Sequence, residues 1–214
     1  MQKLVWGVLF GIFTASALAA NVRVSHLAPL APSVDVYLNG QLKFRNVPFR
    51  GVTEYLAVPK GIYDVQVFRA GTNTQPIISA PNVNLGDGSY TITAAGRGDD
   101  KSYFPVVFSD QMVASPNQAT VRLINASPDL RSIDLSVQNT ELVQNVAYKS
   151  ASSYLRFGPG QYNLEVRLSG FQTPMINIRN LRLEPGKIYT LFVVGLLEDN
   201  TLNYILAEDQ PRQN

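Results

Sequence analysis

"VRVSHLAPLAPSVDV" occupies residues 22–36, and "VRLINASPDLRSIDL" occupies residues 121–135. The second stretch begins 99 residues after the first, and the two align without a gap. The same offset persists to the end of the chain, where Asp110-Gln111 matches Asp209-Gln210. Self-similarity at a fixed period indicates duplicated structural units, and a period of this length corresponds to a whole small domain rather than to a solenoid repeat. The sequence therefore predicts two copies of one domain.

Apolar and polar residues alternate within each copy. Val36 and Leu38 share one face of the stretch 33–39, while Asp35 and Tyr37 take the other. A period of two sustained over several residues is typical of a half-buried β-strand. The same alternation recurs in residues 62–69, 132–137 and 161–168.

Turn signals separate these stretches. Asn39-Gly40 is a hairpin signal, and Gly86-Asp87-Gly88 precedes the strand expected around Tyr90. No part of the chain after residue 20 has a convincing helical periodicity. About seven short strands per copy predict a β-sandwich. We therefore expect an all-β protein with two tandem Ig-like, antiparallel β-sandwich domains that arose by internal duplication.

The first residues, "MQKLVWGVLFGIFTASALAA", have the composition of an export signal. Lys3 is followed by an apolar stretch over residues 4–13, and small residues then lead to the A-x-A pattern of Ala17-Leu18-Ala19. This order is typical of a secretory signal peptide that is removed on export. The alternative is an N-terminal membrane anchor, but the apolar stretch is short for a span of about 20 residues.

The predicted organisation follows from the signal and the repeat. It comprises a signal peptide (1–20), a first sandwich (21–111), a linker (112–119), a second sandwich (120–210) and a C-terminal tail (211–214). We expect the mature chain in the periplasm, at the cell surface or outside the cell. It contains no second apolar run long enough to cross a membrane. Because the chain has no cysteine, the exported protein must be stabilised by its core alone or must act where disulfides are not used.

The overall composition excludes strong electrostatic partners. Charged residues make up 16% of the chain, and the formal net charge is +2. A balance this close to neutral produces no field that would attract nucleic acid. We therefore expect a partner such as another envelope protein or a surface polymer.

The opening phrase also suggests an ion pair in each copy. Alternation points Arg23 away from the core, and Asp35 points outward from the following strand. The equivalent residues are Arg122 and Asp134. We expect each pair to meet across the outer face, where an exposed ion pair contributes only about 0.2–1 kcal/mol.

The repeated phrases are similar to a known family. "VRVSHLAPLAPSVDVYLNGQ", followed by "VPFRGVTEYLAVPKGIYDVQV", resembles the DUF4397 domain, and the resemblance extends over both copies. It implies an exported or cell-envelope bacterial protein of β-sandwich type, with no established activity. Leu30 stands where the family usually has Asp, and Asn125 stands where it usually has His. Neither copy would therefore hold a complete His–Asp pair, which favours a structural role for the motif.

No residue is predicted to be catalytic, cofactor-binding or metal-ligating. His26 is the single histidine, whereas a metal site or hydrolytic triad usually needs more than one such residue. His26 lies at the end of a predicted strand beside a proline-rich turn, where a turn-capping role is expected. The sequence also has no phosphate-binding loop and no nucleophile elbow.

Two acidic segments invite comparison with binding motifs. Asp87 lies in "GDGS", and Asp99-Asp100 lies in "GRGDDKS". A Ca²⁺ site needs six or more oxygen ligands, so ordinary solvated turns explain these residues better. Arg97-Gly98-Asp99 also spells an integrin-binding tripeptide, which arises often by chance.

Three functions remain open from the sequence. The first is a non-enzymatic, exported envelope module that binds a partner or has a structural role. The second is a periplasmic or surface binder of glycans, for which Tyr37 and Phe68 are the outward aromatic candidates. The third is an enzyme, which would depend on His26.

Overall fold

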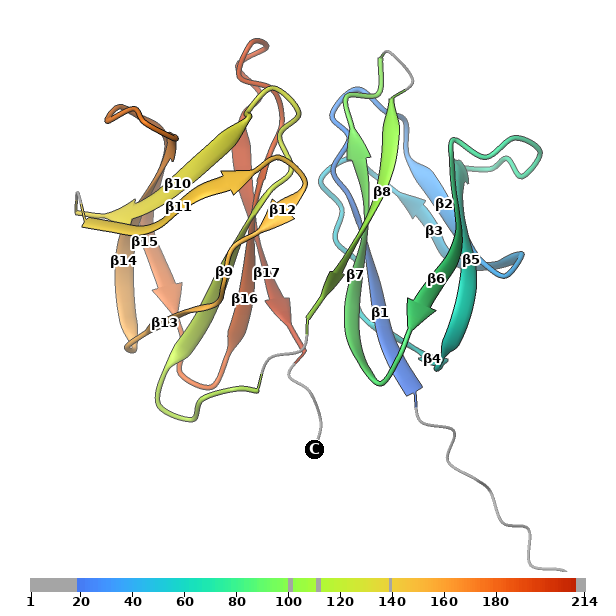
Figure 1. Ribbon diagram of the computed structural model, residues 1–214, viewed down its shortest axis with the longest axis horizontal. Coiled ribbons are helices and arrows are strands. Elements are labelled where there is room, and N and C mark those ends of the chain that lie inside the picture. The colour runs from blue at the N-terminus through green and yellow to red at the C-terminus, as the bar shows by residue number, and fades with distance from the viewer. Residues whose placement is uncertain (1–18, 100–101, 111–112, 139, 211–214) are drawn as a thin grey trace, which may run out of the picture.

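The computed structural model describes residues 19–99, 102–110, 113–138 and 140–210, which form two β-sandwiches (Figure 1). The predicted signal peptide lies almost entirely outside these residues. Its last two residues, Ala19 and Ala20, begin the first strand, where Ala20 is fully buried. Nowhere among the described residues is there a helix with the length and apolar character needed to cross a bilayer.

Each copy contributes its own set of strands. The first copy has β1 (Ala19–His26), β2 (Val34–Leu38), β3 (Gln41–Val47), β4 (Leu56–Pro59), β5 (Gly61–Arg69), β6 (Ile78–Leu85), β7 (Gly88–Gly96) and β8 (Tyr103–Ser109). The second has β9 (Ala119–Asn125), β10 (Ser132–Val137), β11 (Thr140–Ala147), β12 (Ser150–Ala151), β13 (Leu155–Phe157), β14 (Gly160–Leu168), β15 (Pro174–Leu183), β16 (Ile188–Val194) and β17 (Asn203–Asp209).

Two sheets pack together in each copy. The outer sheets have the orders β3-β2-β5-β6 and β11-β10-β14-β15, with every pair antiparallel. The inner sheets have the orders β4-β1-β7-β8 and β12-β9-β16-β17, with β13 also paired to β9. Within them, β1 runs parallel to β7 and β9 runs parallel to β16. The two-sandwich prediction is confirmed, but the inner sheets are mixed because the chain crosses to the outer sheet between their central strands.

Each sandwich closes its own apolar core. The first core is built mainly from valines, among them Val22, Val36 and Val65, and takes its buried residues from the first copy alone. The second core is richer in leucine and isoleucine and takes its buried residues from the second copy alone. Burying one such side chain is worth about 1.5–3 kcal/mol, so these two clusters supply the main stabilisation of each copy.

The two inner sheets face each other, so the molecule has four layers (Figure 1). Every residue of β9 and of β16 is buried, because one face covers its own core and the other covers the opposite sandwich. A third apolar cluster, which we call the junction cluster, contains residues from both copies. Its buried members are Leu27, Phe108, Ile124, Ala126, Phe192 and Val194. The sandwiches are therefore in direct contact rather than merely tethered by the linker.

Local turn chemistry agrees with the sequence at the first hairpin. Asn39 and Gly40 both have positive φ, at 49° and 72°, and they join β2 to β3. This combination is the one that a tight two-residue hairpin requires.

Gly96 and Gly195 occupy equivalent turns after β7 and β16. Their φ angles are +128° and +97°, a region that side chains with a Cβ rarely adopt. A Cβ at Gly195 would lie 2.3 Å from the carbonyl oxygen of Thr201, and one at Gly96 would lie 2.0 Å from that of Ser102. Both turns therefore require glycine for conformation and for space.

Gly195→Ala is expected to lower the free energy of unfolding by about 3 kcal/mol, because backbone strain adds to a clash with a backbone atom. Gly170→Ala is the matched control, since Gly170 has a φ of +85° but a Cβ there would have nothing within 4 Å. Only the strain of about 1–2 kcal/mol applies at that position. Urea denaturation measures both losses, and equal losses would contradict a steric role for Thr201.

Candidate functional site at the junction of the sandwiches

Arg23 is buried at the junction and does not point into solvent. Its side chain is 1% exposed, and its Nη2 lies 2.5 Å from Oδ1 of Asp209 in the other sandwich. Its Nη1 donates to the carbonyl oxygen of Glu208 at 2.9 Å, and its Nε donates to Oγ1 of Thr91 at 2.8 Å. The predicted exposed pair with Asp35 is therefore wrong.

Arg122 repeats this arrangement from the second sandwich. Its Nη2 pairs with Asp110 of the first sandwich, and its Nη1 donates to the carbonyl oxygen of Ser109 at 3.0 Å. Its Nε donates to Oγ1 of Thr190 at 2.9 Å. Each partner stands 99 residues from its counterpart around Arg23, so the polar contacts obey a pseudo-two-fold symmetry.

The two carboxylates are fully engaged. Asp110 also accepts hydrogen bonds from the hydroxyls of Thr91 at 2.6 Å and Tyr55 at 2.8 Å. Asp209 accepts from Thr190 at 2.7 Å and from Tyr154 at 3.5 Å. We call these residues the junction lock. It comprises Arg23, Tyr55, Thr91, Asp110, Arg122, Tyr154, Thr190 and Asp209.

The aromatic rings of the lock cover its cations. The guanidinium carbon of Arg23 lies 4.7 Å from the ring centre of Tyr55, and that of Arg122 lies 5.2 Å from the ring centre of Tyr154. Arg122 lies at a similar distance from Phe108 of the first sandwich, at 5.9 Å. Cation–π contacts of this kind strengthen when the cation is removed from water.

Burial governs the ionisation of the lock. It raises the pKa of Asp209, and the guanidiniums of Arg23 and Arg122 oppose that shift. It also raises the pKa of Tyr55, with a further contribution from the Asp110 carboxylate, so the phenol remains a hydrogen-bond donor. Two cations thus face two carboxylates, with hydroxyl donors filling the remaining positions. These contacts join the two sandwiches to each other.

Asp35 and Asp134 have a different role from the predicted one. Asp35 accepts hydrogen bonds from the amides of Asn46 at 2.6 Å and Gly71 at 2.9 Å. Asp134 accepts from the Asn145 amide at 2.7 Å and from the Ser169 hydroxyl at 2.6 Å. The strand pairing beside each aspartate shifts register, between Val34 and Val36 or the equivalent residues. Each aspartate therefore fixes an irregularity of an outer sheet.

His26 closes the proline-rich turn, as the sequence predicts. It is completely buried, and its Nε2 donates to the carbonyl oxygen of Pro32 at 2.9 Å. Asn125 occupies the equivalent position and donates through Nδ2 to the carbonyl oxygen of Leu130 at 2.9 Å. Burial lowers the pKa of His26 below its ordinary value of 6.5, so the ring is neutral at physiological pH.

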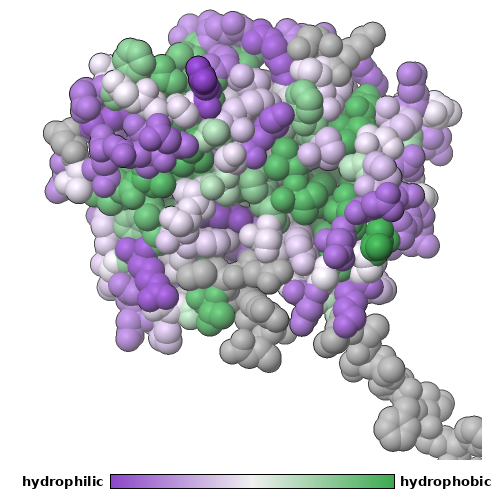
Figure 2. All heavy atoms as spheres, viewed as in Figure 1, coloured by the Kyte–Doolittle hydropathy of each residue, from purple (hydrophilic) through white to green (hydrophobic). Residues whose placement is uncertain are grey.

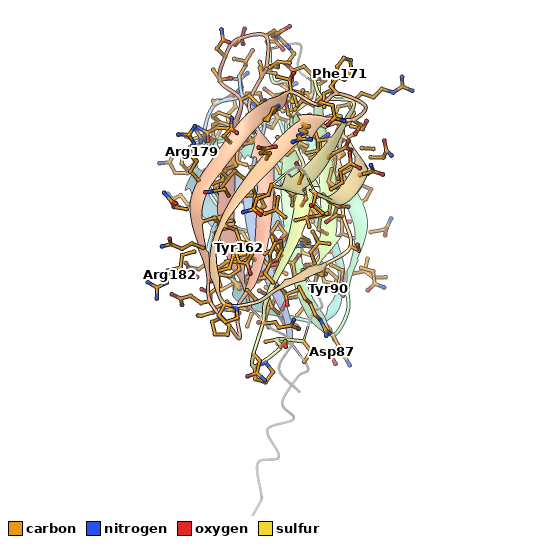
Figure 3. The ribbon with its side chains drawn as sticks, turned by 90° about the vertical axis from the view of Figure 1, so that its left-hand side faces the viewer. Asp87, Tyr90, Tyr162, Phe171, Arg179 and Arg182 are labelled. Carbon is orange, nitrogen blue, oxygen red and sulfur yellow. The ribbon has the colours of Figure 1, made fainter. Side chains whose placement is uncertain are left out.

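The acidic segments do not converge. Asp87 lies at the lower end of the molecule (Figure 3), whereas β7 carries the chain away to the Arg97–Asp99 loop at the other end (Figure 1). No metal-binding cluster of acidic or histidine side chains occurs within the described ranges, and Asp100 lies outside them. Arg97 pairs with Asp99 and with Glu198 of the other sandwich, so its guanidinium is already engaged.

The aromatic pair considered for glycan binding is not an open platform. Tyr37 and Phe68 meet edge to face, with ring centres 5.1 Å apart and an interplanar angle of 72°. Phe68 is 5% exposed. Sugar stacking needs an accessible ring face, and Phe68 does not present one.

A groove runs beside the lock on one side of the junction. It has a volume of about 560 Å³ and lies between the residues after β3 and the edge strand β17. Arg50 and Glu54 are exposed on one wall, and Ile205 and Ala207 lie on the other. At the position equivalent to Arg50, Nζ of Lys149 lies 3.9 Å from the ring centre of Phe104.

Comparison with known proteins identifies the family. A family model described as "Domain of unknown function (DUF4397)" matches residues 20–135 and 119–214. The chain belongs to the DUF4397 family. Two overlapping matches agree with the two copies, and no curated protein is similar enough to count as a relative.

Three solved structures are distantly similar to this DUF4397 protein. The C-terminal domain of AlgF from P. aeruginosa is 21% identical, with a TM-score of 0.35, over 44% of this chain and 99% of that one. The Bacillus anthracis TIE protein is 11% identical, with a TM-score of 0.27, over 83% of this chain and 34% of that one. A putative cell adhesion protein from Bacteroides fragilis is 11% identical, with a TM-score of 0.21, over 91% of this chain and 99% of that one.

Arg122→Met is expected to lower the free energy of unfolding by about 3–5 kcal/mol, because Asp110 loses its cation in a buried site. Arg182→Met is the control, since Arg182 is 77% exposed and its pair with Glu184 is worth less than about 1 kcal/mol. Urea denaturation of both variants gives the comparison. A loss below about 1 kcal/mol for Arg122→Met would show that the lock is not stabilising.

His26→Asn is expected to reduce the loss of stability in acid. The folded chain binds the His26 proton less readily than the unfolded chain, because its pKa is lowered. His26 therefore does not reduce the free energy of unfolding above pH 6.5. Below pH 6.5 it lowers that free energy by up to about 1.4 kcal/mol per pH unit. Urea denaturation at several pH values measures the slope. An identical slope in the variant would contradict this role.

Proposed function

We propose that this DUF4397 protein is an exported, non-enzymatic module of the cell envelope that binds a partner or has a structural role. The observation that supports this proposal is that the buried charged residues pair with one another across the junction. Asp110, Asp209 and their arginine partners are enclosed at the junction and neutralise one another. They connect two sandwiches instead of forming a reactive centre.

A solvent-exposed surface on β8, beside the junction, offers a binding site for a partner. Figure 2 shows hydrophobic side chains gathered over β8, near the junction. Phe104 is 40% exposed and Val107 is 38% exposed on this strand. Because β8 is the last strand of its sheet, its open backbone edge lies beside these side chains. Exposed edges with apolar side chains favour association with another polypeptide.

Export is supported by the composition of residues 1–20. The resemblance of both copies to DUF4397 also implies an exported or cell-envelope protein. The absence of cysteine from the sequence fits a fold stabilised by its cores. The partner is expected to be another envelope protein or a surface polymer.

The test is fractionation of cells that produce the whole chain, followed by capture of bound proteins at high salt. We expect the processed chain in the envelope fraction, with a partner that is lost in Val107→Asp. Ile62→Asp is the control, since Ile62 is 64% exposed but lies on β5, away from the junction. An unprocessed chain in the cytosol would overturn the export proposal. Turnover of a hydrolase substrate that His26→Ala abolishes would overturn the non-enzymatic one.

A further inference from the structure

The apolar part of the junction does not share the symmetry of the lock. At four pairs of equivalent positions, one copy has a large side chain and the other has a small one. The pairs are Ser25 and Ile124, Leu27 and Ala126, Thr93 and Phe192, and Phe108 and Ala207. Five of these side chains belong to the junction cluster, and Ala207 packs against it. Ser25 and Thr93 are buried and hydrogen-bond to each other at 2.7 Å.

This exchange of large for small makes the first and second copies complementary. In the same two-fold arrangement, a pair of second copies would have Phe192 and Ile124 on both sides of the junction. A pair of first copies would have the smaller Ser25 and Thr93 on both sides. Overpacking costs about 1–3 kcal/mol, and cavities are also destabilising.

We propose that the junction is a recognition surface specific for an unlike copy, and that the complementary sandwich of a second chain occupies it when the two sandwiches of one chain cannot meet. Three features carry the inference. Each sandwich has its own core. Within the described ranges, no strand of one sandwich pairs with a strand of the other. The contacts of the lock that join the sandwiches are made by the side chains of Arg23 and Arg122, which reach a carboxylate and a backbone carbonyl at the C-terminal end of the opposite edge strand, β17 or β8.

Nothing in these contacts requires the two sandwiches to belong to one chain. If two chains exchange partners, the first sandwich of each pairs with the second sandwich of the other. Both surfaces of both chains are then occupied, so the assembly closes. This inference goes beyond the proposed function, because it concerns self-association and does not depend on an envelope partner.

The experiment prevents closure within one chain. Deleting residues 111–118 joins Asp110 directly to Ala119, and consecutive Cα atoms are about 3.8 Å apart. Packed sheets lie roughly 10 Å apart, so the two inner sheets of one chain can no longer face each other. Light scattering after size exclusion is expected to show a monomer for the whole chain and a closed dimer or larger assembly for the deletion variant.

Charge reversal identifies the surface that the assembly uses. Arg23→Glu with Arg122→Glu in the deletion variant is expected to weaken assembly at least about 100-fold, because buried carboxylates would face carboxylates. Arg179→Glu with Arg182→Glu is the matched control, since both side chains project outward at the side of the second sandwich (Figure 3). A folded deletion variant that stays monomeric, or an assembly that survives reversal of Arg23 and Arg122, would overturn the proposal.

A second measurement avoids any variant that fails to fold. A protease site inserted after Ala114 in the whole chain allows the linker to be cut with the lock intact. Native mass spectrometry is expected to find the halves joined as unlike pairs, and mixing with an isotope-labelled preparation is expected to exchange them. Halves that separate, or like pairs in comparable amounts, would overturn the proposal. The envelope proposal would be unaffected.

Discussion

Two buried guanidinium groups determine how this molecule is assembled. A charge removed from water must be paired and hydrogen-bonded, or its burial costs several kcal/mol. Arg23 and Arg122 find their carboxylates in the opposite sandwich. Because each guanidinium also donates to a threonine of its own sheet, the two inner sheets meet in one register. The lock therefore specifies the arrangement, whereas the apolar clusters supply most of the stability.

Duplication explains why the lock has two equal halves. Each sandwich provides one arginine, one aspartate, one threonine and one tyrosine, so a surface made for one copy fits the other. Such a self-complementary surface is what a two-fold dimer uses. In the apolar centre the copies have diverged, with Phe192 in one and Thr93 in the other. The polar contacts have kept the pseudo-two-fold symmetry of the duplication, whereas the apolar residues differ between the two copies.

The fold was predictable from sequence because alternation and turn residues act locally. The junction was not, because a strand that faces another sheet through polar side chains has the same pattern as a strand that faces water. Alternation alone therefore places Arg23 in solvent, yet it is buried. One signal was present in the repeat itself. Thr91 and Thr190, and Asp110 and Asp209, match at the offset of 99 residues, although exposed polar positions have little physical reason to match.

The repeated phrase recurs because it closes a turn and fixes a strand irregularity, which both copies need. His26 and Asn125 hold the same turn with different side chains, so the chemistry of histidine is not required there. What differs between the copies lies beside the lock. On one side Nζ of Lys149 lies against one face of the Phe104 ring, whereas on the other side Arg50 is exposed in an open groove. Residues shared by the copies maintain the fold, and a partner that tells the two sides apart must contact the residues that differ.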